Sequence, residues 1–318
     1  MSGSYHDWAQ YVCSQVYNHL ISEVRKKISD DDNQLAKAIL YATSNPGRAL
    51  RPQLVFAARN AVGELPNEEQ PLALAIAGSV ELIHIMSLIY DDLPCMDNSP
   101  TRRGHPSVHK IYGENIAILA ADSLKSLAFE QLSTIDSLSY PGILLRLLSY
   151  LSQASGYSGI CLGQAIDLVN DKNYRNESSV LDMYFLKTGK LIVASIFMGA
   201  WSNPHMSEEL LEPLSRFAKN LGVSFQIIND LRDNLFVNET GKIPHQDLEQ
   251  DKNTLLSYHG PQVCARIALD LLEKSRVDAE LLPGDSSRFC QILAWVVQQI
   301  PIGFRSGTCR KTKSLHET

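Results

Sequence analysis

The amino-acid sequence predicts an all-α fold, organised as a single bundle of helices. Apolar residues recur with helical spacing along most of the 318 residues, whereas alternating strand patterns with hairpin turns are scarce. The stretch Leu72–Tyr90 is apolar nearly all round, which predicts a helix buried inside the bundle. No Gly/Ser/Pro-rich linker divides the chain, so we expect a single domain over residues 1–318, with a frayed tail from about residue 305.

The expected helices follow one another with turn-forming residues between most of them. They are Trp8–Ile28, Gln34–Ala42, Pro52–Val62, Pro71–Tyr90, Ile116–Leu132, Ile143–Leu168, Val180–Ala200, Glu209–Phe236, Val263–Leu272 and Arg288–Gln299. The acidic run Asp30–Asp32 suits the cap and first turn of the second helix, where negative charge complements the helix dipole. Proline and glycine mark the breaks at Asn45–Gly47, Ser202–Pro204 and Leu282–Gly284.

Composition excludes several classes of function. The net charge of -6 and the lack of a basic stripe argue against a nucleic-acid partner. The six cysteines show no CxxC pairing, which indicates reduced thiols in a cytoplasmic protein and no zinc site. The first ten residues do not resemble a signal peptide, and no unbroken apolar run reaches the ~18 residues of a membrane span.

An acidic cluster follows the apolar helix. Asp91, Asp92 and Asp97 lie within seven residues, and Arg102 and Arg103 come directly after them. Hard cations such as Mg²⁺ take carboxylate oxygens and leave other positions to water and phosphate. Arginines bind the remaining phosphate oxygens by paired hydrogen bonds. Because aspartates at the end of a buried helix need a partner, the cluster predicts a magnesium site that holds a polyphosphate.

A second acidic cluster lies late in the chain. Asn229, Asp230 and Asp233 end another apolar helical stretch, and Asn229 and Asp233 share one face of that helix. If the two helices face each other, their acidic ends form two sides of one cavity, between which metal ions can bridge a phosphate group.

The ordered motifs between Arg48 and Thr254 resemble those of the trans-isoprenyl diphosphate synthases, the short-chain members of the polyprenyl synthetase family. Pro46–Pro52 resembles the early basic motif of that family, and the two acidic clusters resemble its two aspartate-rich motifs. The resemblance implies the isoprenoid-synthase helical bundle around a central active-site cavity. It also implies Mg²⁺ as cofactor, isopentenyl diphosphate and an allylic diphosphate as substrates, and a homodimer.

The resemblance also implies a role for particular basic residues. The isopentenyl diphosphate pocket would contain Arg48, Arg51, His84 and Arg103. The allylic diphosphate would be held by Arg102 and Lys252, with Lys242 as a weaker candidate. A wall of positive charge is needed because each diphosphate carries two to three negative charges.

Further motifs would complete the site. Gln164 and Asp167 match the family's mid-chain Gly-Gln-x-x-Asp helix, with Asp167 counted among the metal ligands. Lys187 and Thr188 match a Lys-Thr motif in a locally broken helix, and Gln226 matches an amide that faces the carbocation. The implied reaction is ionisation of the allylic diphosphate, attack by the isopentenyl double bond and loss of a proton, with no protein nucleophile.

Product length would be set by Met86 and Ser87, one helical turn before Asp91. Family members that make the fifteen-carbon product commonly have an aromatic ring there. A flexible Met and a small Ser leave more depth, which favours geranylgeranyl over farnesyl diphosphate.

Two alternatives remain open. Asn229 stands where the family has an aspartate, which suggests a catalytically impaired partner subunit of another synthase. A terpene cyclase would share the bundle and an Asn-Asp motif, but Asp233 and Val237 do not fit its later positions, and a wall of arginines would have no substrate there.

Overall fold

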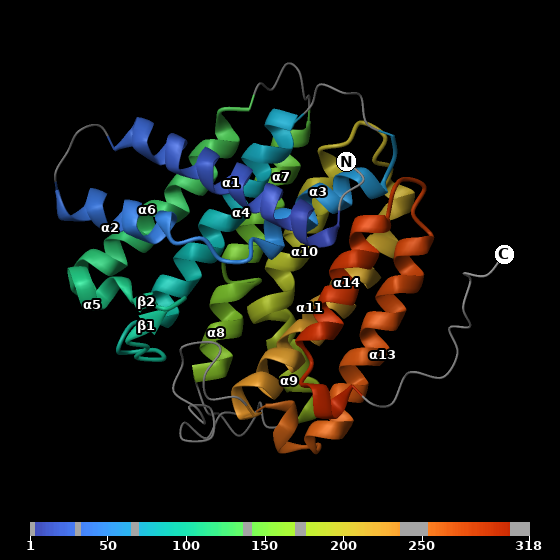
Figure 1. Ribbon diagram of the computed structural model, residues 1–318. Helices are drawn as coiled ribbons and strands as arrows, with labels where there is room; N and C mark the ends of the chain where they lie inside the picture. The colour runs from blue at the N-terminus through green and yellow to red at the C-terminus, as the bar shows by residue number, and fades with distance from the viewer. Residues whose placement is uncertain are drawn as a thin grey trace.

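Helices form nearly all of the regular structure in the computed structural model of the chain (Figure 1). The structure describes residues 4–28, 33–64, 70–135, 142–168, 176–235 and 254–305. Within these ranges the only strands are two short ones that form a single hairpin. The all-α prediction is therefore confirmed.

The elements follow in a simple order. The first part of the chain forms α1 (Tyr5–Lys27), α2 (Gln34–Ser44), α3 (Leu50–Ala61) and α4 (Gln70–Asp91). Next come β1 (Thr101–Arg102), the antiparallel β2 (His105–Pro106), α5 (Val108–Tyr112), α6 (Glu114–Ser133), α7 (Ile143–Ser155) and α8 (Ile160–Leu168). The last part forms α9 (Glu177–Tyr184), the π-helical turn η2 (Phe185–Gly189), α10 (Lys190–Trp201), α11 (Leu211–Leu235), α13 (Pro261–Glu280) and α14 (Ser287–Gln299). Short 3-10 turns are η3 (Glu208–Leu210), η4 (Leu255–Ser257) and η5 (Ile302–Phe304).

Local capping explains where several helices begin. Ser4, Asn33 and Asn176 each accept a hydrogen bond from the backbone N–H three residues later, at 3.3, 2.8 and 2.9 Å. Such caps satisfy N–H groups that have no partner inside the helix. The expected cap at Asp30–Asp32 lies outside the described residues.

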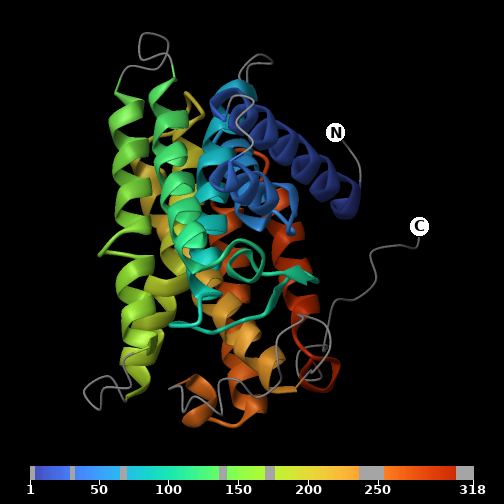
Figure 2. The same cartoon turned by 90° about the vertical axis from the view of Figure 1, so that its left-hand side faces the viewer.

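The apolar helix α4 is at the centre of the bundle. It packs against α1, α3, α6 and α10, and both views show it inside the other helices (Figures 1 and 2). Its side chains Ile76, Leu82 and Ile83 are buried almost completely. Each buried side chain of this size contributes about 1.5–3 kcal/mol relative to exposure, so this helix anchors the core.

The same helix is long and apolar enough to cross a membrane, judged by length and composition alone. Over Pro71–Asp91 its mean hydropathy reaches 2.0. Our expectation that no stretch reaches this length was wrong for α4, because it counted only unbroken apolar runs and Glu81 and His84 interrupt this one. The most apolar 18-residue window of this stretch is 72% buried inside the structure, as in the core helix of a folded domain. A single such helix is weak evidence for a membrane span.

Some local features differ from the sequence prediction. The expected helix Ile143–Leu168 is two helices, because the chain turns at Gly156–Gly159 and Gly156 adopts an extended conformation. The hairpin and the short helix α5 were not expected. The expected helix Val180–Ala200 is interrupted by η2, which agrees with the locally broken helix that the family resemblance implied around Lys187 and Thr188.

Candidate active site

A cavity of about 360 Å³ lies among α3, α4, the hairpin, α8, η2, α11 and α14. Its size is in the range of small-molecule sites. Most of the residues singled out from the sequence line it: Arg48, Arg51, His84, Ser87, Asp91, Asp97, Arg102, Arg103, Gln164, Asp167, Lys187, Thr188, Gln226, Asn229, Asp230 and Asp233. The fold thus brings both acidic clusters and the basic motif to one place.

The first acidic cluster lies where α4 ends. Helix α4 stops at Asp91, and the backbone N–H of Asp97 donates to the Asp91 carbonyl at 2.9 Å, which folds the connecting loop back onto the helix end. Asp91 and Asp97 both line the cavity. Asp92 is buried, does not line it, and instead accepts hydrogen bonds from Arg102, with Nε at 3.0 Å from Oδ1.

The second acidic cluster lies near the end of α11. Asn229, Asp230 and Asp233 all line the cavity. Asp230 is buried and accepts hydrogen bonds from Gln226 Nε2 at 2.8 Å and from the hydroxyl of Tyr184. The same hydroxyl accepts from the Leu255 backbone N–H at 2.8 Å, so the Tyr184 side chain connects α11 with the chain that follows residue 253.

The π-helical turn η2 presents two polar groups to the cavity. The hydroxyl of Thr188 donates to Gln226 Oε1 at 2.6 Å, which fixes the orientation of that amide. Lys187 Nζ donates to Asp167 Oδ2 at 2.6 Å. Gly163 of α8 permits this approach, because a Cβ atom there would overlap the Lys187 backbone. Such single π-helical turns are frequent at functional sites.

Lys187 carries its positive charge amid the acids. Burial acts against the charge, but the carboxylates of Asp167, Asp91 and Asp97 outweigh burial and raise the pKa of Lys187. The lysine therefore lies close enough to both Asp167 and the first acidic cluster to respond to their charge. It is a cation placed where a phosphate bound between those carboxylates would also need one.

Arg48, Arg51, His84 and Arg103 line the same cavity and are called the basic wall below. Arg51 and His84 each have a buried nitrogen, Nε and Nδ1, that finds no hydrogen-bond partner among the described residues. Burial lowers the pKa of Arg51 to about 10, with Glu81 acting in the opposite direction. Burial and then the charges of Arg51, Arg103 and Arg102 lower the pKa of His84 well below its usual value, so the imidazole is neutral at neutral pH. Buried polar nitrogens without a partner beside a cavity indicate a site that a ligand completes, and the Arg51 guanidinium favours an anionic one.

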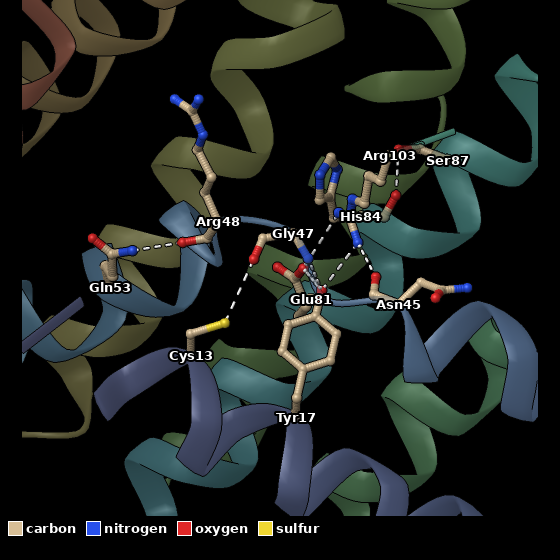
Figure 3. Close-up of polar contacts among 10 residues, drawn as sticks. All are labelled: Cys13, Tyr17, Asn45, Gly47, Arg48, Gln53, Glu81, His84, Ser87 and Arg103. Carbon is tan, nitrogen blue, oxygen red and sulfur yellow. Dashed lines mark hydrogen bonds and ion pairs between the residues drawn. The ribbon is translucent and has the colours of Figure 1, made fainter. Parts of the chain in front are cut away.

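Arg48 belongs to the basic wall, but its contacts are with helix α14. It extends away from Glu81 and Arg103 (Figure 3). Its NH1 donates to Gln299 Oε1 at 2.7 Å, and its guanidinium lies 5.3 Å from the centre of the Trp295 ring. Both partners belong to α14 and line the cavity.

The oxygen ligands fit Mg²⁺ that is shared with a substrate. Among the described residues there is no group of three or more His, Cys, Asp or Glu side chains arranged to enclose a metal by themselves. Mg²⁺ does not require such a group, since it is commonly held by one or two carboxylates together with water and phosphate oxygens. Asp91 at the end of α4 and Asp97 in the loop after it, with Asn229 and Asp233 on α11, supply oxygen atoms from two parts of one cavity.

Some sequence predictions are not found at the cavity. Met86 is buried in the core and does not line it, whereas its neighbour Ser87 does. Lys252 and Lys242 lie outside the described residues. For Asp92, the ion pair with Arg102 is the interaction that the structure gives, and its role as a metal ligand stays a prediction.

Sequence reasoning also missed cavity residues, among them Glu81, Tyr184, Trp295 and Gln299. One available signal was Glu81, a charged residue inside an otherwise apolar helix, because a buried charge needs a partner. The aromatic residues carry no comparable local signal.

Comparisons with known proteins agree with this geometry. The family model described as polyprenyl synthetase matches residues 32–280. The chain is 38% identical over 266 residues to geranylgeranyl pyrophosphate synthase 7, chloroplastic, of Arabidopsis thaliana, covering 82% of this chain and 74% of that protein. It is 34% identical over 287 residues to the farnesyl diphosphate synthase of Haemophilus influenzae, covering 90% and 95%. The solved structure of a geranyltransferase from Helicobacter pylori, complexed with magnesium and isoprenyl diphosphate, aligns with a TM-score of 0.78 at 30% identity, covering 94% and 98%.

Proposed function

We propose that this chain, which belongs to the polyprenyl synthetase family, condenses isopentenyl diphosphate head to tail with an allylic diphosphate in a Mg²⁺-dependent reaction. The observation that carries the proposal is the division of one cavity into two charged sides. The charges of Asp91, Asp97 and Asp167 act on Lys187, which defines the acidic side, whereas the charges of Arg51 and Arg103 act on His84, which defines the basic side. A cyclase or hydrolase that acts on a single diphosphate has no use for the second side.

The two diphosphates would occupy different sides. The allylic diphosphate suits the acidic side, where Mg²⁺ can bridge its oxygens to the carboxylates and where Lys187 and Arg102 supply fixed cations. Isopentenyl diphosphate suits the basic wall, where the unpartnered nitrogens of Arg51 and His84 can donate to its oxygens. When bound, Mg²⁺ would supply charge neutralisation of the leaving diphosphate.

The chain's own residues would stabilise the allylic cation. Thr188 and Gln226 are joined by a hydrogen bond and lie beside the cavity, so their dipoles need little rearrangement when positive charge develops. Leu88, Ile160 and Phe225 line the same cavity and exclude water from the cation. In this proposal the departing diphosphate accepts the proton, so that no protein base is required.

The twenty-carbon product is the finer part of the proposal. Ser87 lines the cavity one turn before Asp91, and its small side chain leaves depth for a growing chain. The neighbouring Met86 faces the core instead, so Ser87 carries the length argument in this structure. Relatives of both product lengths exist among the similar proteins, so we base this preference on Ser87 alone.

A homodimer is a further part of the proposal, and it would form through α6 and α7. These two helices run side by side on one face of the molecule (Figure 2). They expose Ile118, Leu119 and Leu145 by 44%, 52% and 75%. Light scattering of the purified protein should give twice the chain mass, and the double substitution Leu119→Glu with Leu145→Glu should return it to one.

A cytoplasmic location completes the proposal. The described cysteines Cys13, Cys95, Cys161, Cys264 and Cys290 are all free thiols, which suits a reducing compartment. Fractionation of cells that produce the protein would test this location.

One observation favours a second candidate, a catalytically impaired partner subunit. Asn229 provides a neutral amide oxygen where its neighbours Asp230 and Asp233 provide charge, so one of the metal positions is weaker. Both candidates predict diphosphate binding, but only the synthase turns substrate over by itself.

The deciding experiment is incubation of the purified protein with Mg²⁺, labelled isopentenyl diphosphate and each allylic starter in turn. We expect a linear twenty-carbon diphosphate by mass spectrometry, complete loss of product with EDTA, and recovery on adding Mg²⁺. Asp91→Ala should abolish turnover, and Asp270→Ala, at an exposed aspartate on α13, is the matched control. Absence of product with every starter, combined with product from Asn229→Asp, would instead identify the partner subunit.

A further inference from the structure

Tyr17, from the N-terminal helix, contacts Glu81 and Arg103 beside the cavity. Tyr17 lies on α1, outside residues 32–280 that match the family model. Its hydroxyl donates a hydrogen bond of 2.6 Å to Glu81 Oε1 on α4, and both side chains are buried (Figure 3). Helix α1 is therefore joined by this hydrogen bond to a residue that lines the cavity.

The Tyr17 hydroxyl uses all of its hydrogen-bonding capacity. A phenol has one hydrogen to donate and two lone pairs to accept. The hydrogen goes to Glu81, and the oxygen accepts from the Gly47 backbone N–H at 3.1 Å and from Arg103 NH1 at 3.2 Å. Burial, followed by the negative charge of Glu81, raises the pKa of Tyr17, so the hydroxyl keeps this hydrogen. One atom thus joins α1, α4, the turn before α3 and the hairpin.

Glu81 supplies a buried negative charge among arginines. It is 1% exposed, lines the cavity and lies one turn before His84 on α4. Its Oε1 is 3.9 Å from Arg103 NH2, and Oε2 accepts no hydrogen bond from the described residues. Its charge acts on Arg51 as well. A buried carboxylate in this position offsets the mutual repulsion of the cations around it.

Arg103 is held tightly by these groups. Its NH1 also donates to the Asn45 carbonyl at 2.7 Å. The guanidinium packs on Gly47 so closely that a Cβ atom at Gly47 would overlap it. Arg103 itself adopts a left-handed backbone conformation, with φ 55°, which is uncommon for a residue with a side chain. Arg103 therefore departs from the extended backbone of β1, and its hydrogen bonds to Tyr17 and the Asn45 carbonyl orient its side chain.

We infer that Tyr17 and Glu81 are positioning residues that hold Arg103 and the 45–47 turn for the isopentenyl diphosphate. This inference rests on the proposed function, because it assigns that substrate to the basic wall. Both residues act through Arg103, and neither needs to touch the diphosphate.

The effect should be confined to one of the two substrates. The neighbouring Arg102 is held by Asp92, which belongs to the first acidic cluster, and in the described part of the chain no hydrogen bond or ion pair joins it to Tyr17 or Glu81. Loss of Tyr17 or Glu81 should therefore disturb the side of the cavity with Arg103 and leave the allylic side in place. A role only in stabilising the fold would not separate the two substrates in this way.

The test compares Tyr17→Phe, Glu81→Gln and Gly47→Ala with the unsubstituted protein. Calorimetric titration with isopentenyl diphosphate should show affinity about tenfold lower in each variant. Arg103 loses a hydrogen bond in Tyr17→Phe, its buried counter-charge in Glu81→Gln, and its place beside Gly47 in Gly47→Ala. In the elongation assay, KM for isopentenyl diphosphate should rise by a similar factor while KM for the allylic starter changes less than about twofold. The double variant with Tyr17→Phe and Glu81→Gln should lose little more than either single one, since both act through the same arginine.

Matched controls lie on α13, away from the cavity. Asp278→Asn neutralises a buried acid that accepts from Arg216 at 2.8 Å, and Ser275→Ala removes a buried hydroxyl that donates to the Phe217 carbonyl at 3.2 Å. Both should bind isopentenyl diphosphate with unchanged affinity. If Tyr17→Phe or Glu81→Gln does not fold, Gly47→Ala decides, because it displaces the guanidinium while keeping both positioning residues.

Three outcomes would overturn the inference. They are affinity within twofold of the unsubstituted protein in the folded variants, an equal rise of both KM values, and absence of isopentenyl diphosphate binding by the unsubstituted protein. A protein that binds isopentenyl diphosphate but elongates no starter would refute the proposed function alone. In that case the affinities of the variants and of the unsubstituted protein for isopentenyl diphosphate would still decide the role of Tyr17 and Glu81.

Discussion

Lys187 Nζ and Asp167 Oδ2 form an ion pair of 2.6 Å that joins the π-helical turn η2 to helix α8. Both side chains are largely shielded, with 21% and 8% of their surface exposed. Removing one partner of a shielded pair takes away part of the compensation for the other charge, which costs more than the net value of the pair.

The first prediction concerns this pair. Lys187→Met should lower the free energy of unfolding by about 1.5–3 kcal/mol, because the Asp167 carboxylate loses its charged hydrogen bond from Lys187. It should also raise KM for the allylic diphosphate, since the cation beside that substrate is lost. Urea unfolding and steady-state kinetics would measure the two effects. The double variant with Asp167→Asn should recover much of the stability but not the KM; recovery of both would show that Lys187 has only a structural role.

The second prediction concerns Asn229. Asn229→Asp should lower the Mg²⁺ concentration required for half-maximal activity several-fold, because a charged oxygen replaces a neutral one. Titration of initial rates with Mg²⁺ at saturating substrates would show the shift. Asn220→Asp, on the same helix but not at the cavity, is the matched control. An unchanged or higher requirement for Mg²⁺ would mean that Asn229 does not face a metal.

The third prediction concerns product length. Ser87→Phe should shorten the product from twenty to fifteen carbons, because Ser87 lines the cavity and a ring there would shorten it. Met86→Tyr should instead destabilise the protein by about 1–3 kcal/mol, because Met86 is only 3% exposed and a larger side chain would overpack the core. Mass spectrometry of products and thermal unfolding would separate the two cases. A shorter product from Met86→Tyr with unchanged stability would show that Met86 does limit the length of the product.

The fourth prediction concerns pH. The folded protein holds His84 neutral with its pKa well below the usual value, whereas the unfolded chain protonates His84 near pH 6.5. The unfolded state therefore binds more protons below that pH, and the free energy of unfolding should fall as the pH drops from 7 toward 5.

His84→Gln should remove this part of the pH dependence, which urea unfolding at a series of pH values would measure. Isopentenyl diphosphate should bring the pKa of His84 back up, because its negative charge favours the imidazolium. Identical pH profiles for His84→Gln and the unsubstituted protein would contradict this account.

Much of the bundle follows from local patterns. Helical spacing of apolar residues predicted every long helix, since each needs one apolar face toward the core. The break at Gly156 was missed because the apolar spacing continues across it from α7 into α8. The hairpin was missed because its strands are two residues long, too short for an alternating pattern to be visible.

The residues of the candidate site also fall into those that the sequence predicted and those that it did not. Asp91 and Asp97 were predicted because metal chemistry depends on residue type and spacing, whereas Lys187 was predicted because its motif resembles that of the family. Trp295 and Tyr17 were missed because they reach the site only through packing between distant helices. Tyr17 and Glu81 are 64 residues apart in sequence, and no local pattern encodes that contact.

Adjacent arginines in the hairpin have different partners: Arg102 binds Asp92, and Arg103 binds Tyr17 and the Asn45 carbonyl. They separate because the chain leaves the strand at Arg103. One residue inserted or deleted at this turn would present a different side chain to each partner. The spacing between α4 and α5 is therefore restricted in length as well as in composition, and we expect insertions and deletions among relatives to avoid this turn.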